Sequence, residues 1–272
     1  MLYYFNRDVL EFGKGEANLG NDFAIIASTP KIESFYDILI FTDSKGLSLD
    51  NDRHHETWSY KLGTDLSCDG KSVLIVTRPK EITTFFTLLN FIDLNKIKFK
   101  YLISNLGFVD FTPKKNEFIL DIKRQIPHGI SEKSLKVNSM GYYLLSSGKL
   151  DHLYSFDYGN NHVILGNRLA KSFELVLLLN VLEFDSTMNI KRKRPDAFFT
   201  QLKVSNKWIY LISSHSTNIK YIEHDISDLE PEQVSYDAVH FTSLGHSNLY
   251  TQLLGQCIIN GIFTGNSQNS SN

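Results

Sequence analysis

Apolar residues occur in three short continuous runs within the first 110 positions, and polar or turn-forming residues follow each run. The runs are DILIFTDS (37–44), KSVLIVTRP (71–79) and FKYLISNLG (99–107). Continuous runs rich in Ile, Val, Leu and Phe are typical of strands buried on both faces, whereas half-exposed strands alternate apolar and polar residues. The pattern therefore predicts three buried strands.

Between these runs, apolar residues recur at the three- and four-residue spacing of a helix. Within 54–66, Trp58, Leu62 and Leu66 are four residues apart, and 81–92 carries a similar apolar face. Alternating strands and helices predict a parallel sheet with right-handed crossovers and helices on both faces.

The rest of the chain contains further predicted elements. We expect helices at 114–126, at 169–184 and from about 243 to 262, and strands at 207–214 and 220–226. Residues 1–35 are expected to add an N-terminal extension or edge hairpin, and residues 127–165 to form an insertion of short strands or loops. Residues 1–262 would then form a single α/β domain, followed by a polar, disordered tail at 263–272.

Composition and charge narrow the classes of partner. The chain has 272 residues, of which 42% are hydrophobic, and 28 basic residues stand against 30 acidic ones. A net charge of −2 implies no bulk attraction to nucleic acid or to anionic membranes. The N-terminus lacks the apolar core of a signal peptide, and the apolar stretch 173–184 is too short to span a bilayer. We therefore expect a soluble, cytoplasmic protein that binds neither nucleic acid nor membranes.

Cofactor and metal chemistry have no support in the sequence. It contains no P-loop, no Gly-x-Gly-x-x-Gly after a strand and no His/Cys cluster with ligand spacing. Cys68 and Cys257 are far apart and are expected to be reduced, buried residues. We predict no cofactor and no metal site.

Polar residues at the carboxyl ends of the predicted strands are the first candidates for a site, because open parallel sheets bind ligands there. Ser44 follows the first run and precedes a Lys-Gly turn, so its hydroxyl can project and nearby backbone N–H groups can face an anion. Arg78 follows the second run, and Asn105, Gly107 and Asp110 follow the third.

The stretch YDAVHFTSLGH (236–246) supplies the groups that a serine nucleophile needs. Serine attacks poorly unless an imidazole accepts its proton, and the imidazole needs a partner on its other nitrogen. His240 is a candidate base, with Asp237 or a backbone carbonyl as its partner. In the simpler interpretation, Ser44 caps a turn and His240 is a loop histidine bonded to the backbone.

These stretches resemble conserved blocks of the SGNH, or GDSL, hydrolases. DILIFTDSKGLSL is similar to the first block, in which a strand delivers Gly-Asp-Ser, and YDAVHFTSLGHSNLYTQLL is similar to the last, Asp-x-x-His before a Gly-containing helix. YLISNLGFVDFTPKK stands where the family carries Gly-x-Asn-Asp. The resemblance spans about residues 36–260. It implies a three-layer α/β/α sandwich whose central parallel sheet has about five strands in flavodoxin-like order.

The resemblance also implies roles for single residues. Ser44 would be the nucleophile and one oxyanion donor through its backbone N–H, His240 the general base and Asp237 its partner. The sequence departs from the family at the oxyanion hole. Thr42 stands in place of the first glycine, Val109 in place of the oxyanion-hole asparagine, and the glycine expected after the second strand has no counterpart.

Four residues near these departures are candidates for the oxyanion hole or for substrate contact. Arg78 and Asn105 are candidates for replacement donors, while Gly107 and Asp110 match the family motif. Asp110 also suits a helix cap. Since one missing donor can lower the rate about 100- to 1,000-fold, either the hole is built differently or catalysis is weak.

Three other histidines and a basic run have competing interpretations. His54 and His55 are more typical of a solvated helix start, and His215, at the end of the predicted strand 207–214, is the rival to His240 as base. The run KRKRP (191–195) is more typical of a solvated loop than of a polyanion-binding patch.

The sequence therefore predicts a serine esterase that acts through an acyl-serine intermediate. The range of the resembling family suggests an O-acetyl ester on a carbohydrate as substrate. Two alternatives stay open: acyl transfer to a glycan hydroxyl, which an added acceptor alcohol would reveal, and binding without catalysis, which the missing donors favour. The oligomeric state is not predicted.

Overall fold

A seven-stranded sheet forms the centre of the molecule. The computed structural model describes residues 1–6, 9–12, 24–46, 54–78, 83–144, 149–184, 186–188, 194 and 196–265. The strands of this sheet are β1 (Tyr3–Phe5), β2 (Ala24–Ala27), β3 (Phe35–Thr42), β4 (Val73–Thr77), β5 (Lys98–Ser104), β8 (Leu175–Leu179) and β9 (Ile219–Ile222).

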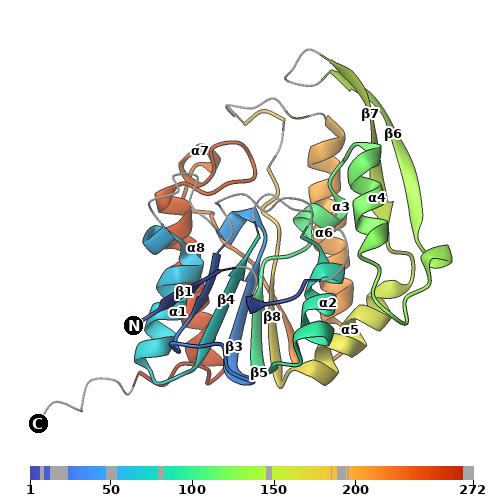
Figure 1. Cartoon of the computed structure of the whole chain (residues 1–272). Helices are drawn as coiled ribbons and strands as arrows, with labels where there is room; N and C mark the ends of the chain where they lie inside the picture. Colours follow the sequence, from blue (N-terminus) through green and yellow to red (C-terminus); the bar gives the residue numbers. More distant parts are fainter. Residues whose placement is uncertain are drawn as a thin grey trace, which may run out of the picture.

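The strand order is β1-β2-β4-β3-β5-β8-β9, and the five strands from β4 to β9 are parallel. Numbered along the chain, these five have the flavodoxin-like order 2-1-3-4-5. Helices α1 (Trp58–Cys68) and α8 (Ser243–Ile259) cover one face, and α2 (Phe85–Asn95), α5 (Asn161–Ser172) and α6 (Asp196–Ser213) cover the other (Figure 1). The predicted three-layer α/β/α fold is confirmed.

The three apolar runs near the N-terminus form the middle of the sheet. Residues 38–41 of β3 and 73–76 of β4 are almost completely buried, because helices cover both faces of these strands. The following helix α2 starts at a capping box, in which Thr84 and Thr87 exchange side-chain and backbone hydrogen bonds. Each strand thus delivers its polar end to the same edge of the sheet.

Two segments add antiparallel pairs to this parallel core. Within the predicted N-terminal extension, β1 pairs with β2, and β2 pairs with the edge of β4. Within the predicted insertion, β6 (Lys136–Leu144) and β7 (Leu150–Asp157) form a separate two-stranded ribbon at the side of the molecule that carries α4 (Asn116–Arg124) (Figure 1). Helix α5 begins before the predicted end of that insertion.

Two predicted elements are wrong. The segment 169–184 is not one helix, because α5 ends at Ser172 and Leu175–Leu179 is the buried strand β8. The predicted strand 207–214 is instead the last part of α6, which has 18 residues. Short apolar runs fit a buried strand and a buried helix equally well, so periodicity alone could not separate the two.

Smaller corrections concern the cysteines and the C-terminal tail. Cys257 is buried as expected, but Cys68 is exposed at the end of α1. Thr264, in the predicted disordered tail, donates hydrogen bonds to the Asp69 carboxylate through its backbone N–H and its hydroxyl. Positions 266–272 of that tail lie outside the described residues. Among the helices that the structure describes, none has the length and apolar character needed to cross a membrane.

Candidate active site

Ser44 begins a short 3-10 turn, Ser44–Gly46, directly after β3 at the carboxyl edge of the sheet. The buried Asp43 carboxylate stabilises this turn by accepting the backbone N–H of Lys45 at 2.9 Å. The first residue of α1, Trp58, donates its indole N–H to the Lys45 carbonyl at 3.1 Å. Two elements therefore position the predicted nucleophile.

Thr42, which stands in place of the family's first glycine, is accommodated by a glycine later in the turn. The Thr42 side chain is fully buried, and a Cβ atom at Gly46 would overlap its hydroxyl oxygen. The Thr42 side chain therefore occupies the space that a side chain at position 46 would need, and the turn accommodates Thr42 because residue 46 is glycine.

Asp237 and His240 form a close pair on the loop before α8. The His240 Nδ1 atom lies 3.2 Å from Oδ1 and 3.1 Å from Oδ2 of Asp237. The same carboxylate accepts the backbone N–H groups of Val239 at 3.1 Å and His240 at 2.9 Å. The loop is closed by Ser235, whose hydroxyl donates to the His240 carbonyl at 2.9 Å. The carboxylate, and not a backbone carbonyl, is thus the partner of the imidazole.

Arg194 binds the Asp237 carboxylate of this pair. Its Nη2 lies 2.7 Å from Asp237 Oδ2, and its Nε donates to the Asp237 carbonyl at 3.1 Å. Burial by itself raises the pKa of Asp237, but hydrogen bonds from His240 and the charges of His240 and Arg194 outweigh it and hold this pKa well below its usual range. The expectation of a solvated loop was wrong for Arg194, while 191–193 and 195 lie outside the described residues.

At the end of β5, Asn105 joins the turn that carries Ser44. Its side-chain oxygen accepts the backbone N–H of Asp43 at 3.2 Å, and its Nδ2 donates to the Asp43 carboxylate at 3.2 Å. Gly107 follows with φ +119°, and a Cβ atom there would lie 2.7 Å from Ile209 Cδ1, so glycine is required. Asn105 is the predicted replacement donor that reaches the turn.

Asp110 is placed as a helix cap. It is fully buried, and its Oδ1 accepts the backbone N–H of Phe85 at 3.0 Å, at the start of α2, and the Tyr158 hydroxyl at 2.6 Å. Burial raises the pKa of Asp110 to about 6, although these hydrogen bonds and the Lys114 charge act in the opposite direction. Val109, in place of the family asparagine, packs against the core and offers no donor.

Arg78 is directed toward the N-terminal segment. Its buried guanidinium lies 4.5 Å above the centre of the Phe12 ring, and its backbone N–H donates to the Thr42 carbonyl at 3.2 Å. Arg78 is absent from the described residues that line the cavity beside Ser44. Of the two candidate replacement donors, Asn105 lines this cavity and Arg78 does not.

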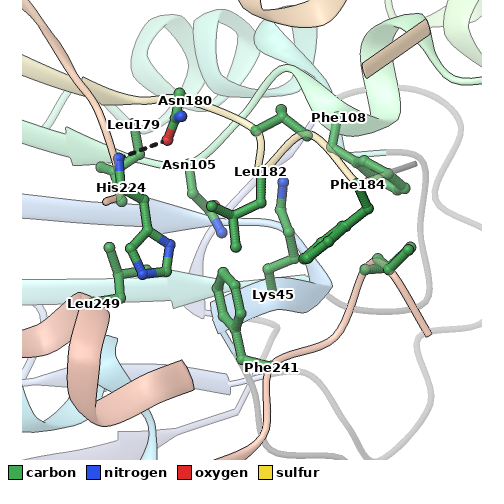
Figure 2. Close-up of a pocket in the computed structure, with 13 residues that line it drawn as sticks. Lys45, Asn105, Phe108, Leu179, Asn180, Leu182, Phe184, His224, Phe241 and Leu249 are labelled. Atoms are coloured by element: carbon green, nitrogen blue, oxygen red, sulfur yellow. Dashed lines mark hydrogen bonds between the residues drawn. The ribbon is translucent and has the colours of Figure 1, made fainter. Parts of the chain in front are cut away.

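That cavity lies between the turn after β3, the ends of β8 and β9 and the Asp–His loop. Its volume is about 10 Å³, which is room for about one water molecule. Figure 2 shows Lys45 among the apolar side chains of Leu182, Phe184 and Phe241. Asn105 and His224 add polar groups.

The turn and the loop flank this cavity together. Lys45, which follows Ser44, and Val239, which precedes His240, both line it. No hydrogen bond joins the Ser44 hydroxyl to the His240 ring in the described part of the chain. Such contacts often tighten only when substrate binds.

The rival histidines lie elsewhere. His215 stands between the end of α6 and the start of β9, at the opposite edge of the sheet, and its ring packs 5.2 Å from that of His162. His54 and His55 form a 3-10 turn before α1, and His55 is exposed. His215 was a rival only because its segment had been predicted as a strand.

Sequence reasoning missed three residues at the site: Lys45, Arg194 and His224. His224 follows β9 and bonds through Nε2 to Asn248 Oδ1 at 2.7 Å, and burial lowers its pKa to about 4. Lys45 belongs to the predicted Lys-Gly turn, but no pattern in the sequence indicated that its side chain is buried. Among the described residues, no group of three or more His, Cys, Asp or Glu side chains is arranged to hold a metal ion.

The arrangement matches what the resemblance to SGNH hydrolases implies, with Asp-Ser after the first parallel strand and Asp-x-x-His after the last. No protein-family model matches the sequence, and no curated protein matches it. The chain is similar to several solved structures at low sequence identity.

One is Axe2, an acetylxylan esterase from Geobacillus stearothermophilus, here a catalytic mutant (12% identity, 81% of this chain, 93% of that chain, TM-score 0.48). Another is the psychrotrophic esterase EstA from Pseudoalteromonas sp., with 12% identity over 84% of this chain and 100% of that chain and a TM-score of 0.47. A third is LAE5, an alpha/beta hydrolase enzyme from the metagenome of Lake Arreo, with 15% identity over 84% of this chain and 96% of that chain and a TM-score of 0.46.

Proposed function

We propose that this protein is a serine esterase that cleaves its substrate through an acyl intermediate on Ser44. The observation that carries the proposal is the Asp237–His240 pair, with Nδ1 3.1 Å from the carboxylate, on a loop that flanks the same cavity as the Ser44 turn. A carboxylate bonded to one imidazole nitrogen leaves the other nitrogen to accept the serine proton.

The reaction then has two halves. Ser44 Oγ attacks the ester carbonyl carbon while His240 accepts the hydroxyl proton; the ester C–O bond breaks, and the alcohol leaves with the proton that His240 returns. In the second half, His240 takes a proton from water, whose oxygen attacks the acyl-serine carbonyl. The acid is released as the proton returns to Ser44, and Asp237 stabilises the imidazolium in both halves.

The proposed substrate carries a short acyl group. The cavity is small and has apolar walls such as Leu182, Phe184 and Phe241, so it leaves no room for a long acyl chain. The family resemblance extends this to an O-acetyl ester on a carbohydrate. Acyl transfer to a glycan hydroxyl would use the same intermediate and stays an alternative.

A fluorophosphonate probe tests the proposal, because it reacts with activated serine hydroxyls. We expect the purified wild type to be labelled, Ser44→Ala to be unlabelled, and His240→Ala to react slower by several orders of magnitude. Ser214→Ala and His215→Ala are matched controls, since Ser214 is exposed after α6 and His215 lies at the opposite sheet edge. Both should label like the wild type.

Two results would reject the esterase assignment: a wild type that the probe does not label, or labelling that persists in Ser44→Ala. The first result would favour the alternative of a binding protein without catalysis.

A further inference from the structure

The Lys45 ammonium group is buried beside the cavity without a hydrogen-bond acceptor. Its side chain is only 6% exposed, and in the described part of the chain its Nζ has no hydrogen-bond partner. The closest charge is Asp43 Oδ2 at 3.4 Å, and the centre of the Phe108 ring lies 4.8 Å from Nζ. Three N–H donors are therefore buried beside one carboxylate oxygen and an aromatic ring, with no hydrogen bond to either.

Such an arrangement is costly unless an anion completes it. Burying an ammonium group costs several kcal/mol, and one carboxylate offsets this only in part when its geometry is poor. Asp43 Oδ1 already accepts hydrogen bonds from the Lys45 backbone and from Asn105. Burial lowers the pKa of Lys45, while the charges of Asp43 and Asp110 act against that shift.

The position of this group matches the position where a negative charge would form. Lys45 follows the proposed nucleophile directly in sequence and lines the cavity together with Asn105. The chain lacks two donors that the family resemblance leads one to expect, since Val109 offers none and the glycine expected after β4 has no counterpart. In a cavity with apolar walls, one ammonium can compensate for weaker donors because electrostatic attraction is less screened there.

We infer that the Lys45 ammonium is the anion-binding group of this cavity, and that it binds a small carboxylate and the oxyanion formed on a substrate at Ser44. The oxyanion part rests on the proposed esterase function, whereas carboxylate binding does not require catalysis. The two parts can therefore fail separately.

Acetate binding tests the carboxylate part in a background that cannot turn over. Acetate is titrated into Ser44→Ala and into Ser44→Ala combined with Lys45→Met, and binding is followed by ligand-observed NMR. We expect acetate to bind Ser44→Ala and its affinity to fall about 10- to 100-fold without the ammonium, which is the usual effect of a charge-assisted hydrogen bond. Acetamide, the neutral analogue, should bind both proteins equally weakly.

Two further variants separate anion binding from a structural ion pair. Adding Asp43→Asn to Lys45→Met avoids an unpaired buried carboxylate and keeps an acceptor for Asn105, so thermal stability shows whether the fold survives. Lys61→Met removes a lysine on α1 whose Nζ bonds to Ser247, and it should leave acetate affinity unchanged. Acetate affinity that is unchanged by Lys45→Met in a folded protein, or no acetate binding to Ser44→Ala, would overturn the inference.

Hydrolysis of 4-nitrophenyl acetate tests the oxyanion part. We expect kcat of Lys45→Met to fall about 100- to 1,000-fold with little change in KM, because the interaction is strongest in the transition state. An unchanged kcat would refute the oxyanion role. If wild type binds acetate through Lys45 but neither hydrolyses the ester nor reacts with the fluorophosphonate, the proposed function fails and the anion site stands.

Discussion

At the residue scale, Asp237 has more partners than the orientation of one imidazole requires. It accepts two backbone N–H groups of its own loop, contacts His240 Nδ1 through both oxygens, and pairs with Arg194 at 2.7 Å. A side-chain ion pair and a local loop therefore hold the carboxylate from two sides. The Asp237 carboxylate orients the His240 ring, and Arg194 helps to hold that carboxylate in place. The orientation of His240 therefore depends on Arg194.

We therefore predict that Arg194→Met lowers kcat by about 10- to 100-fold, the effect of a misplaced catalytic group. The ion pair with Asp237 would be lost while the length of the side chain is largely kept. Kinetics with 4-nitrophenyl acetate measure the effect.

The matched control is Arg168→Met, which removes an equally close ion pair, with Asp93 at 2.6 Å, between α5 and α2. It should leave kcat unchanged. If Arg194→Met also had full activity, the Asp237 loop would hold its geometry without the arginine.

At the element scale, the start of α8 packs against the loop that carries the Asp–His pair. Thr242 caps the helix by accepting the Gly245 backbone N–H at 3.0 Å, and the Thr242 backbone N–H donates to the Val234 carbonyl at 2.9 Å. A Cβ atom at Gly245 would overlap that same Val234 carbonyl oxygen. A glycine in the first turn of α8 is thus required by close packing.

Two glycines of α8 are expected to respond in opposite ways to alanine. Gly245→Ala should lower the free energy of unfolding by about 1–3 kcal/mol, because the helix must move away from Val234. Gly255→Ala should raise it by about 0.5–1 kcal/mol, since no atom lies near its Cβ position and alanine favours helix. Urea denaturation of both variants measures the difference. Equal effects would contradict the packing explanation.

At the scale of the whole molecule, charged groups are buried beneath the carboxyl edge of the sheet. Asp43 and Lys45 form one pair, and Asp110 and Lys114 influence each other beside the Tyr158 hydroxyl. Burial lowers the pKa of Lys114 to about 7, while Asp110 has a pKa of about 6. The stability of the fold is therefore linked to pH.

The sign of this linkage can be tested with Asp110→Asn. An unfolded aspartate loses its proton near pH 3.9, but folded Asp110 keeps it until about pH 6, so this residue makes folding less favourable as pH rises from 4 to 6. Lys114 is charged in both states over most of that interval. Asparagine keeps an acceptor for Phe85 and Tyr158.

We expect the free energy of unfolding of Asp110→Asn, relative to wild type, to increase steadily between pH 4 and pH 6. Urea denaturation at several pH values measures this difference. Parallel curves for the two proteins would show that Asp110 ionises normally in the folded state.

Several structural features followed from the sequence for clear physical reasons. The buried strands β3, β4 and β5 were predictable because continuous apolar runs bounded by polar residues are typical of strands covered on both faces. The contact between Asp237 and His240 was also predictable, because the two residues are close in sequence and a local loop can join them. The secondary structure of the β8 segment and of the last part of α6 was not predictable, because a short apolar run is compatible with both a buried strand and a buried helix.

By itself, the sequence determined the succession of strands and helices from β3 to β5, and placed Ser44 and the Asp–His pair at the ends of the first and last parallel strands. These features depend on local patterns and on the handedness of the strand connections. Only the tertiary structure decided what surrounds them: Arg194 against Asp237, Asp110 beneath α2, and Lys45 beside the cavity. Burial and ion pairing depend on contacts between residues that are distant in the chain. The spacing of these residues in the sequence does not indicate that they meet in the folded protein.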